Sequence, residues 1–149
     1  WSCASITAVD HCAELVDFAR QHDASSGITY LCSDLFEAVK GRYDLIVFNA
    51  PYLVEEKGNR LGLIPDDLSR KRFSGGNDGA ATIRRFLTDC PQHLKQDGLA
   101  LLGVNHYHIS EETLQTAIYK SGLQPVDIRF NAFSKACVYV LREKSNAQM

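Results

Sequence analysis

Four consecutive residues, Asn49-Ala50-Pro51-Tyr52, carry groups suited to holding a planar nitrogen. The Asn49 side chain offers a carbonyl acceptor, and the backbone carbonyl of Ala50 is a second acceptor beside it. Two adjacent acceptors can grip both hydrogens of an –NH₂ group and direct its lone pair outwards, while Tyr52 offers an aromatic face for a flat amide or base. The four residues therefore predict a site for a nucleophilic amino or amide nitrogen. The plainer alternative is a proline-containing turn in which Asn49 caps its own backbone.

The residues before this tetrapeptide predict where it lies in a fold. Residues 44–48 form a short, nearly unbroken apolar run, which is typical of a parallel strand buried on both faces. Pro51 has no amide hydrogen and a fixed φ, so regular pairing stops there. Ligands of open α/β sheets bind at the carboxyl ends of the strands. We therefore expect Asn49 and its neighbours at a binding edge.

Two acidic residues follow two earlier predicted strands in the same way. Asp10 ends a strand over residues 5–9 that feeds a helix, and Asp34 follows a strand over residues 27–32. An acid at the tip of such a strand can bind both hydroxyls of a ribose. Asp34 can accept a hydrogen bond from an adenine amino group, while the Leu35 amide faces a ring nitrogen. For both acids the alternative is a local cap of the segment that follows.

The tetrapeptide resembles the Asn-Pro-Pro-Tyr motif of amino-directed, S-adenosylmethionine-dependent methyltransferases, with Ala50 in place of the first proline. The order of segments along the chain is similar to that of the HemK-like glutamine methyltransferases. It runs from FNAPYL through a variable segment to GGNDGAATIRRFL and then to the apolar residues 98–102. The similarity is greatest to the compact archaeal and eukaryotic members that modify class I release factors. It covers roughly residues 6–141, and the loop at 49–52 is its specific part.

The resemblance implies an α/β fold with the Rossmann-like sheet of class I methyltransferases, mostly parallel with an antiparallel C-terminal strand. It implies S-adenosyl-L-methionine as cofactor, with ribose bound by the first acid and adenine by the second. The favoured reaction is N5-methylation of a glutamine in a release factor, and a small activator subunit is an implied partner. The cofactor-binding residues would be Asp10, His11, Asp34, Leu35 and Asn49, and the catalytic residues Asn49, Ala50, Pro51 and Tyr52.

Two other functions stay open. The same loop could grip the amino group of adenine N6 or guanine N2 in RNA or DNA, although a net charge of −2 and a pI near 6.2 give no global basic field for nucleic acid. The second is a non-catalytic, methyltransferase-like binding subunit. Retention of Asp10, Asp34 and Asn49 together argues against it, since a scaffold needs none of them.

One part of the family pattern is missing. Class I methyltransferases hold the methionine part of the cofactor on a glycine-rich loop after a first, central strand, and neither is seen. A sheet without its middle strand leaves two unpaired edges, which is costly. We therefore expect residues 1–149 to be a single methyltransferase domain that is the downstream part of a complete one. Six strands are expected, the last two as an antiparallel pair at the sheet edge: 4–9, 27–32, 43–48, 98–104, 124–130 and 136–142.

The composition is that of an ordinary globular domain, with 45% hydrophobic and 23% charged residues. No apolar run approaches the length of a membrane span, so no membrane partner is expected. The five cysteines are scattered and odd in number, so they indicate neither a disulfide framework nor a zinc site, and they fit a reducing cytoplasm. Three of them, in strand-like segments, are interpreted as small buried apolar residues: Cys3, Cys32 and Cys137.

The remaining segments carry weaker signals. Residues 53–77 form a long connection of mixed charge, whose length suggests a functional loop or a lid and whose charges suggest a solvated surface. A glycine-rich turn then opens a helix, with Asp78 as its expected N-cap. His106 and His108 lack a carboxylate or cysteine partner at a familiar metal-ligand spacing, so we interpret them as loop residues and expect no metal site.

Overall fold

The computed structural model describes residues 5–23, 27–131 and 133–144. It divides into two compact units, Trp1–Gly41 and Arg42–Met149. The expectation for Cys3, and for residue 4 at the start of the first strand, lies outside the described residues. No described helix is long and apolar enough to cross a membrane.

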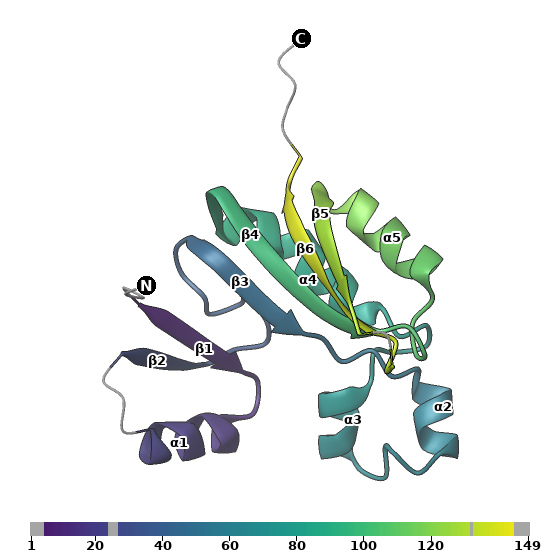
Figure 1. Cartoon of the computed structure of the whole chain (residues 1–149). Helices are drawn as coiled ribbons and strands as arrows, with labels where there is room; N and C mark the ends of the chain where they lie inside the picture. The colour runs from purple at the N-terminus through teal and green to yellow at the C-terminus, as the bar shows by residue number, and fades with distance from the viewer. Residues whose placement is uncertain (1–4, 24–26, 132, 145–149) are drawn as a thin grey trace. The chain divides into compact units, whose positions relative to one another are not determined.

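The described part of the first unit, residues 5–23 and 27–41, contains two parallel strands and one helix (Figure 1). They follow one another as β1 (Ile6–Asp10), α1 (Ala13–His22) and β2 (Ile28–Cys32). β1 and β2 pair in parallel, with Asp10 opposite Cys32, and α1 packs against both strands. The predicted strand, helix and strand are confirmed, with Asp10 at the tip of the first. Cys32 is exposed because it stands at the last position of β2, so its interpretation as a buried residue is wrong.

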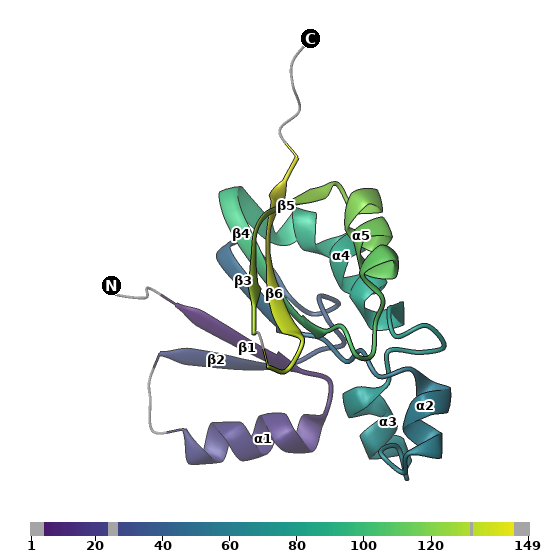
Figure 2. The same ribbon diagram turned by 45° about the vertical axis from the view of Figure 1, so that its right-hand side comes forward.

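The second unit contains a four-stranded mixed sheet in the order β3-β4-β6-β5. β3 and β4 are parallel, whereas β6 runs antiparallel to both of its neighbours. The predicted antiparallel pair is therefore confirmed, with β5 at the sheet edge. Figures 1 and 2 show α4 (Ala81–His93) and α5 (Glu111–Lys120) side by side on one face of this sheet. The strands are β3 (Tyr43–Asn49), β4 (Leu94–Asn105), β5 (Leu123–Phe130) and β6 (Ala136–Glu143).

The apolar core of the second unit lies between the sheet and these two helices. Phe48 of β3 stacks on Phe86 of α4, with ring centroids 4.5 Å apart. Leu102 and Tyr139 continue the row of Phe48 across the sheet and are almost fully buried. Burying side chains of this size contributes about 1.5–3 kcal/mol each. The core therefore fixes the position of β3 and of the residues that follow it.

The opposite face of β3 is not buried. Side chains alternate along a strand, so Leu45 and Val47 point away from α4. They are 52% and 68% exposed. The prediction that this strand is buried on both faces is therefore wrong for the described residues, because the two helices of this unit that cover its sheet, α4 and α5, lie on one face.

The connection after β3 is more ordered than its sequence suggests. It contains two short helices, α2 (Glu55–Arg60) and α3 (Asp67–Phe73), where a long loop or lid was expected. The N-cap of α3 is Asp66, whose side chain accepts a 2.7 Å hydrogen bond from the Ser69 amide, and this bond lowers the pKa of the Asp66 carboxyl. Gly58 of α2 is buried because the Ile64 side chain lies directly on it. A cap and a buried contact therefore replace the expected loop.

The turn before α4 also differs from the expectation. The N-cap of α4 is Ala80, so the predicted capping role of Asp78 is wrong. The Asp78 carboxylate instead accepts the Ala80 amide at 3.1 Å and pairs with the Arg84 guanidinium at 2.6 Å. This pairing lowers the pKa of the Asp78 carboxyl. Asp78 therefore fixes the turn from a position before the cap.

Candidate active site

The loop after β3 is anchored at both ends. Asn49 lies opposite Gly103 of β4, and the Ala50 amide donates to the Gly103 carbonyl at 3.2 Å. Beyond Pro51, the Leu53 amide donates to the Phe73 carbonyl at 3.0 Å, and the Leu53 carbonyl accepts the Gly75 amide at 2.9 Å. Two fixed ends leave little freedom for the residues between them. The predicted end of pairing at Pro51 is confirmed.

Both predicted acceptors of this loop are unengaged. Among the described residues, none donates a hydrogen bond to the Asn49 side chain or to the Ala50 carbonyl. Asn49 is exposed, whereas the Ala50 residue is 3% exposed and packed in place. The alternative in which Asn49 caps its own backbone is therefore not seen. The loop therefore holds two acceptors without a partner, one on the exposed Asn49 side chain and one on the buried Ala50 backbone.

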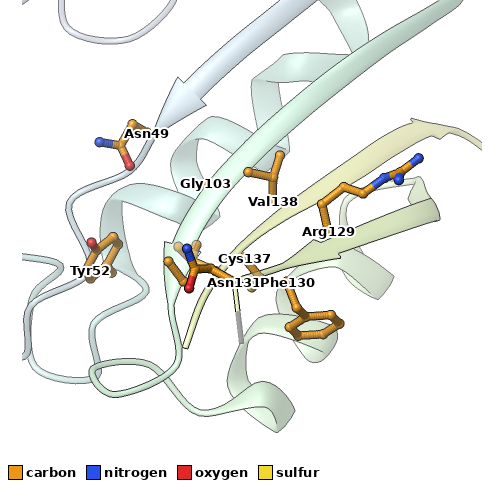
Figure 3. Close-up of a pocket in the computed structure, with 10 residues that line it drawn as sticks. Asn49, Tyr52, Gly103, Arg129, Phe130, Asn131, Cys137 and Val138 are labelled. Carbon is orange, nitrogen blue, oxygen red and sulfur yellow. The ribbon is translucent and has the colours of Figure 1, made fainter. Parts of the chain in front are cut away.

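A pocket of about 350 Å³ opens beside Asn49 (Figure 3). Its floor is one row of residues across the sheet, because Asn49 pairs with Gly103, Gly103 with Val138, and Val138 with Arg129. Paired residues share a face, so this row lies on the side away from α4 and α5. The lining residues are Asn49, Tyr52, Gly103, Val104, Arg129, Phe130, Asn131, Ala136, Cys137 and Val138.

Most of this lining was not predicted from the sequence. Asn49 and Tyr52 were named, but the residues of β4, β5 and β6 were not, because their register depends on which strands become neighbours. Arg129 is the charged residue of the lining. Its Nε lies 2.6 Å from the Asp127 carboxylate, and its side chain is 79% exposed. The signal that could have pointed to it is its place near the end of an expected edge strand.

The predicted cofactor residues of the first unit meet at one edge of its sheet. β1 and β2 are parallel neighbours, so Asp10 at the end of β1 and Asp34 just after β2 belong to adjacent strand ends. The Ser33 amide donates to the Asp10 carbonyl at 2.9 Å. Ser33 is buried, and its hydroxyl donates to the Leu35 carbonyl at 3.0 Å and accepts the Ala38 amide at 2.9 Å. The turn after β2 is therefore held from inside, with Asp34 exposed.

Asp10 fits a hydroxyl-bearing ligand. Its Oδ1 accepts the Cys12 amide at 2.8 Å, which fixes the carboxylate, while its Oδ2 has no partner among the residues described. The side chain is 44% exposed, and His11 Nδ1 lies 3.7 Å from Oδ1. One oxygen thus supports the turn before α1, and the other is available to a ribose. The structure groups the named residues as Asp10, His11, Asp34 and Leu35 in one unit, and Asn49, Ala50, Pro51 and Tyr52 in the other.

The two histidines expected in a loop lie in the turn after β4. His106 has a partner for each ring nitrogen, with Nδ1 3.1 Å from the Ile109 carbonyl and Nε2 3.1 Å from the Tyr139 hydroxyl. The Ile109 carbonyl can only accept, so Nδ1 donates in that contact. No cluster of three metal-ligating side chains is found in the described part of the chain.

Comparison with known proteins places the chain near one group of enzymes. No family model matches it. The ribosomal protein uL3 glutamine methyltransferase of Bordetella pertussis is 28% identical over 151 aligned positions, covering 96% of this chain and 48% of that protein. Its counterpart from Xanthomonas campestris is 37% identical over 61% of this chain and 30% of that protein. The release factor glutamine methyltransferase of Streptococcus pneumoniae is 30% identical over 68% of this chain and 38% of that protein.

Solved structures agree on the fold. A ribosomal protein L11 methylase from Lactobacillus delbrueckii aligns with a TM-score of 0.66 at 17% identity, covering 94% of this chain and 58% of that chain. Another similar structure, solved as a complex with SAH, aligns with a TM-score of 0.60 at 15% identity over 92% of this chain and 38% of that chain. The predicted resemblance and fold class are thus confirmed. The chain spans about a third to a half of the length of the first curated relatives it matches.

Proposed function

We propose that this chain, similar in sequence to the protein glutamine methyltransferases and alike in fold to S-adenosylmethionine-dependent enzymes, methylates the side-chain amide nitrogen of a glutamine in a protein. The observation that carries the proposal is the pair of unengaged acceptors, Asn49 Oδ1 and the Ala50 carbonyl, at the carboxyl end of β3. Two acceptors are the number that the two hydrogens of a primary amide require. A prediction of catalytic roles for Asn49, Ala50, Pro51 and Tyr52 rests on the same geometry.

The chain's own residues would act mainly by positioning. Asn49 and Ala50 accept the two amide hydrogens, and Tyr52, which lines the pocket, offers its ring to the flat amide. When bound, S-adenosylmethionine supplies an electrophilic methyl group on its sulfonium. Asn49 and Ala50 would hold the acceptor nitrogen toward that methyl group, and the nitrogen would give up one proton to water in becoming the methylated amide. Holding reactants at near-attack distance can supply about 7–11 kcal/mol of the barrier, so no strong base is needed.

The cofactor assignment rests on the first unit. The open Oδ2 of Asp10 suits the hydroxyls of a ribose, and the exposed Asp34 suits the amino group of adenine. His11 lies beside the Asp10 carboxylate, and Leu35 belongs to the turn that Ser33 fixes. These four roles are supported by geometry within one unit and by the fold of the related structures.

For the acceptor we propose a glutamine in a translation protein, with a release factor preferred. Relatives are named for release factors and for ribosomal protein uL3, which supports a protein acceptor over a nucleobase. The expectations of a small activator subunit and of a cytoplasmic location stay predictions.

We also propose that this chain is the downstream part of one complete methyltransferase domain. Two observations support this: the matched part covers only 30% and 48% of two relatives, and in the described residues β1 and β3 each pair on one side only. Unpaired strand edges are usually covered or paired. Further chain could supply a partner strand for each of these edges.

Transfer of a radiolabelled methyl group from S-adenosylmethionine tests the function. The natural polypeptide that carries this sequence is incubated with a release factor, protein uL3, tRNA, rRNA and duplex DNA, alongside the Asn49→Ala variant. We expect label on a glutamine of one of the two proteins, and much less with the variant. Label in nucleic acid alone would replace the proposed acceptor with a nucleobase. Equal labelling by both forms would remove the role of Asn49.

A further inference from the structure

The Tyr52 ring is supported by a second ring from a distant part of the chain. The imidazole of His108 stacks on it, with ring centroids 5.8 Å apart and planes inclined by 19°. This is within the range of offset aromatic stacking. Tyr52 lines the pocket, whereas His108 lies outside the lining. Of the two stacked rings, Tyr52 therefore faces the pocket, and His108 supports it without lining the pocket.

The close approach of the two loops depends on a glycine. A β-carbon on Gly79 would lie 2.7 Å from the Tyr52 carbonyl oxygen and 3.2 Å from the His108 carbonyl oxygen. Gly79 also has a φ of +76°, which L side chains rarely adopt. The glycine-rich turn before α4 thus lies between the loop of Tyr52 and the loop of His108. The glycine-rich turn and the loop of His108 thus have a structural role, although the proposed reaction uses neither.

His108 is held by its packing and not by a hydrogen bond of its ring Nδ1. That atom is buried and has no hydrogen-bond partner among the residues described. The loop itself is tied to α2, because Lys57 Nζ donates to the Tyr107 carbonyl at 3.1 Å. Burial, and then the nearby Lys57 charge, lower the pKa of the imidazole, which favours the neutral ring. A buried nitrogen without a partner is unfavourable. The stacking on Tyr52 is the favourable contact of the His108 ring that the described residues show.

We propose that His108 is a positioning residue that holds the Tyr52 ring at the acceptor pocket, so that the ring is already oriented when the acceptor amide arrives. This inference rests on the proposed function. It adds a residue that never touches the acceptor and acts only through Tyr52. Because the interaction is ring on ring, phenylalanine at this position keeps it and alanine removes it.

Three variants test the proposal by methyl transfer to the acceptor protein: His108→Ala, His108→Phe and Tyr107→Ala. The last is a matched control, because it removes an exposed ring from the same loop without touching Tyr52. We expect His108→Ala to lower kcat on the order of 10-fold, within the up to ~10²-fold that misalignment can cost, with unchanged cofactor affinity. His108→Phe should restore kcat to near wild type, and Tyr107→Ala should leave it there.

A second measurement does not depend on activity. In protein with ¹³C-labelled tyrosine rings, the Tyr52 resonance is assigned by its loss in Tyr52→Phe. We expect it to move in His108→Ala and to move little in Tyr107→Ala. An unmoved Tyr52 resonance, or a kcat in His108→Ala equal to that of the wild type or of Tyr107→Ala, would overturn the proposal. If the wild type methylates no acceptor, the proposed function fails, and the resonance still decides whether the His108 ring contacts Tyr52.

Discussion

Asn49 lies opposite Gly103 in the parallel β3–β4 pair, and a β-carbon on Gly103 would lie 3.2 Å from the Asn49 Oδ1 atom. That distance is tighter than most real β-carbon contacts, so a methyl group there would press on the side-chain amide. The same absence of a side chain leaves the floor of the pocket open between Asn49 and Val138. The absence of a side chain at Gly103 therefore leaves space for the Asn49 side-chain amide.

Gly103→Ala is expected to separate activity from stability. Alanine is favoured over glycine in a strand by roughly 0.5–1 kcal/mol, so the free energy of unfolding should stay the same or rise. A shift of the Asn49 amide by a few tenths of an ångström should nevertheless slow methyl transfer several-fold, less than the ~10²-fold of a 1 Å misplacement. Gly27→Ala is the matched control, because a β-carbon there meets no atom within 4 Å. Unchanged turnover in Gly103→Ala would show that the Asn49 amide tolerates this contact.

Cofactor binding is tested with two substitutions of Asp10. Asp10→Asn keeps an oxygen that can accept the Cys12 amide, whereas Asp10→Ala removes it. Hydrogen bonds to a charged group contribute about 1.5–3 kcal/mol each, so loss of the carboxylate should weaken S-adenosylmethionine binding roughly 10- to 150-fold. We expect both variants to bind weakly in calorimetry on the complete protein. Full affinity in Asp10→Asn would assign Asp10 to the turn before α1 alone.

The pKa of His108 predicts how stability varies with pH. Burial and the Lys57 charge lower this pKa from its ordinary value near 6.5, so the unfolded chain binds the proton more readily than the folded one. The stability that results is present above pH 6.5 and is lost as the pH falls from there through the folded-state pKa. We expect the difference in unfolding free energy between pH 7.5 and pH 5 to be smaller in His108→Phe than in the wild type. Equal differences in the two proteins would mean that His108 titrates normally.

Much of the fold could be predicted from short stretches of sequence. The apolar run before Asn49 and the proline after it predicted β3 and its abrupt end, because both signals act within a few residues. Asp10 stood at the tip of β1 for the same reason. The helices α2 and α3 were missed because their mixed charges give no regular apolar face. Their order comes from the Asp66 cap and from Ile64 packed on Gly58, and the second is visible only in three dimensions.

The candidate site was predicted only where it is contiguous in sequence. The Asn49–Tyr52 loop could be named because its chemistry lies in neighbouring residues. Gly103, Val138 and Arg129 reach the same row through strand pairings between distant segments, and no local pattern sets that register. His108 could not be assigned to Tyr52 either, since a ring contact across two loops leaves no signal in spacing.

The central claim is that Asn49 and the Ala50 carbonyl together hold the nucleophilic nitrogen. Single-turnover methyl transfer to the acceptor protein, measured alongside cofactor affinity, tests it in Asn49→Ala and in Ala50→Pro. Asn49→Ala removes one of the two acceptors, whereas Ala50→Pro keeps its carbonyl but removes the amide that donates to Gly103. We predict that Asn49→Ala slows transfer on the order of 10²-fold with little change in cofactor affinity, and that Ala50→Pro stays active. A rate close to wild type in Asn49→Ala would contradict the account, because the loop would then be only a turn.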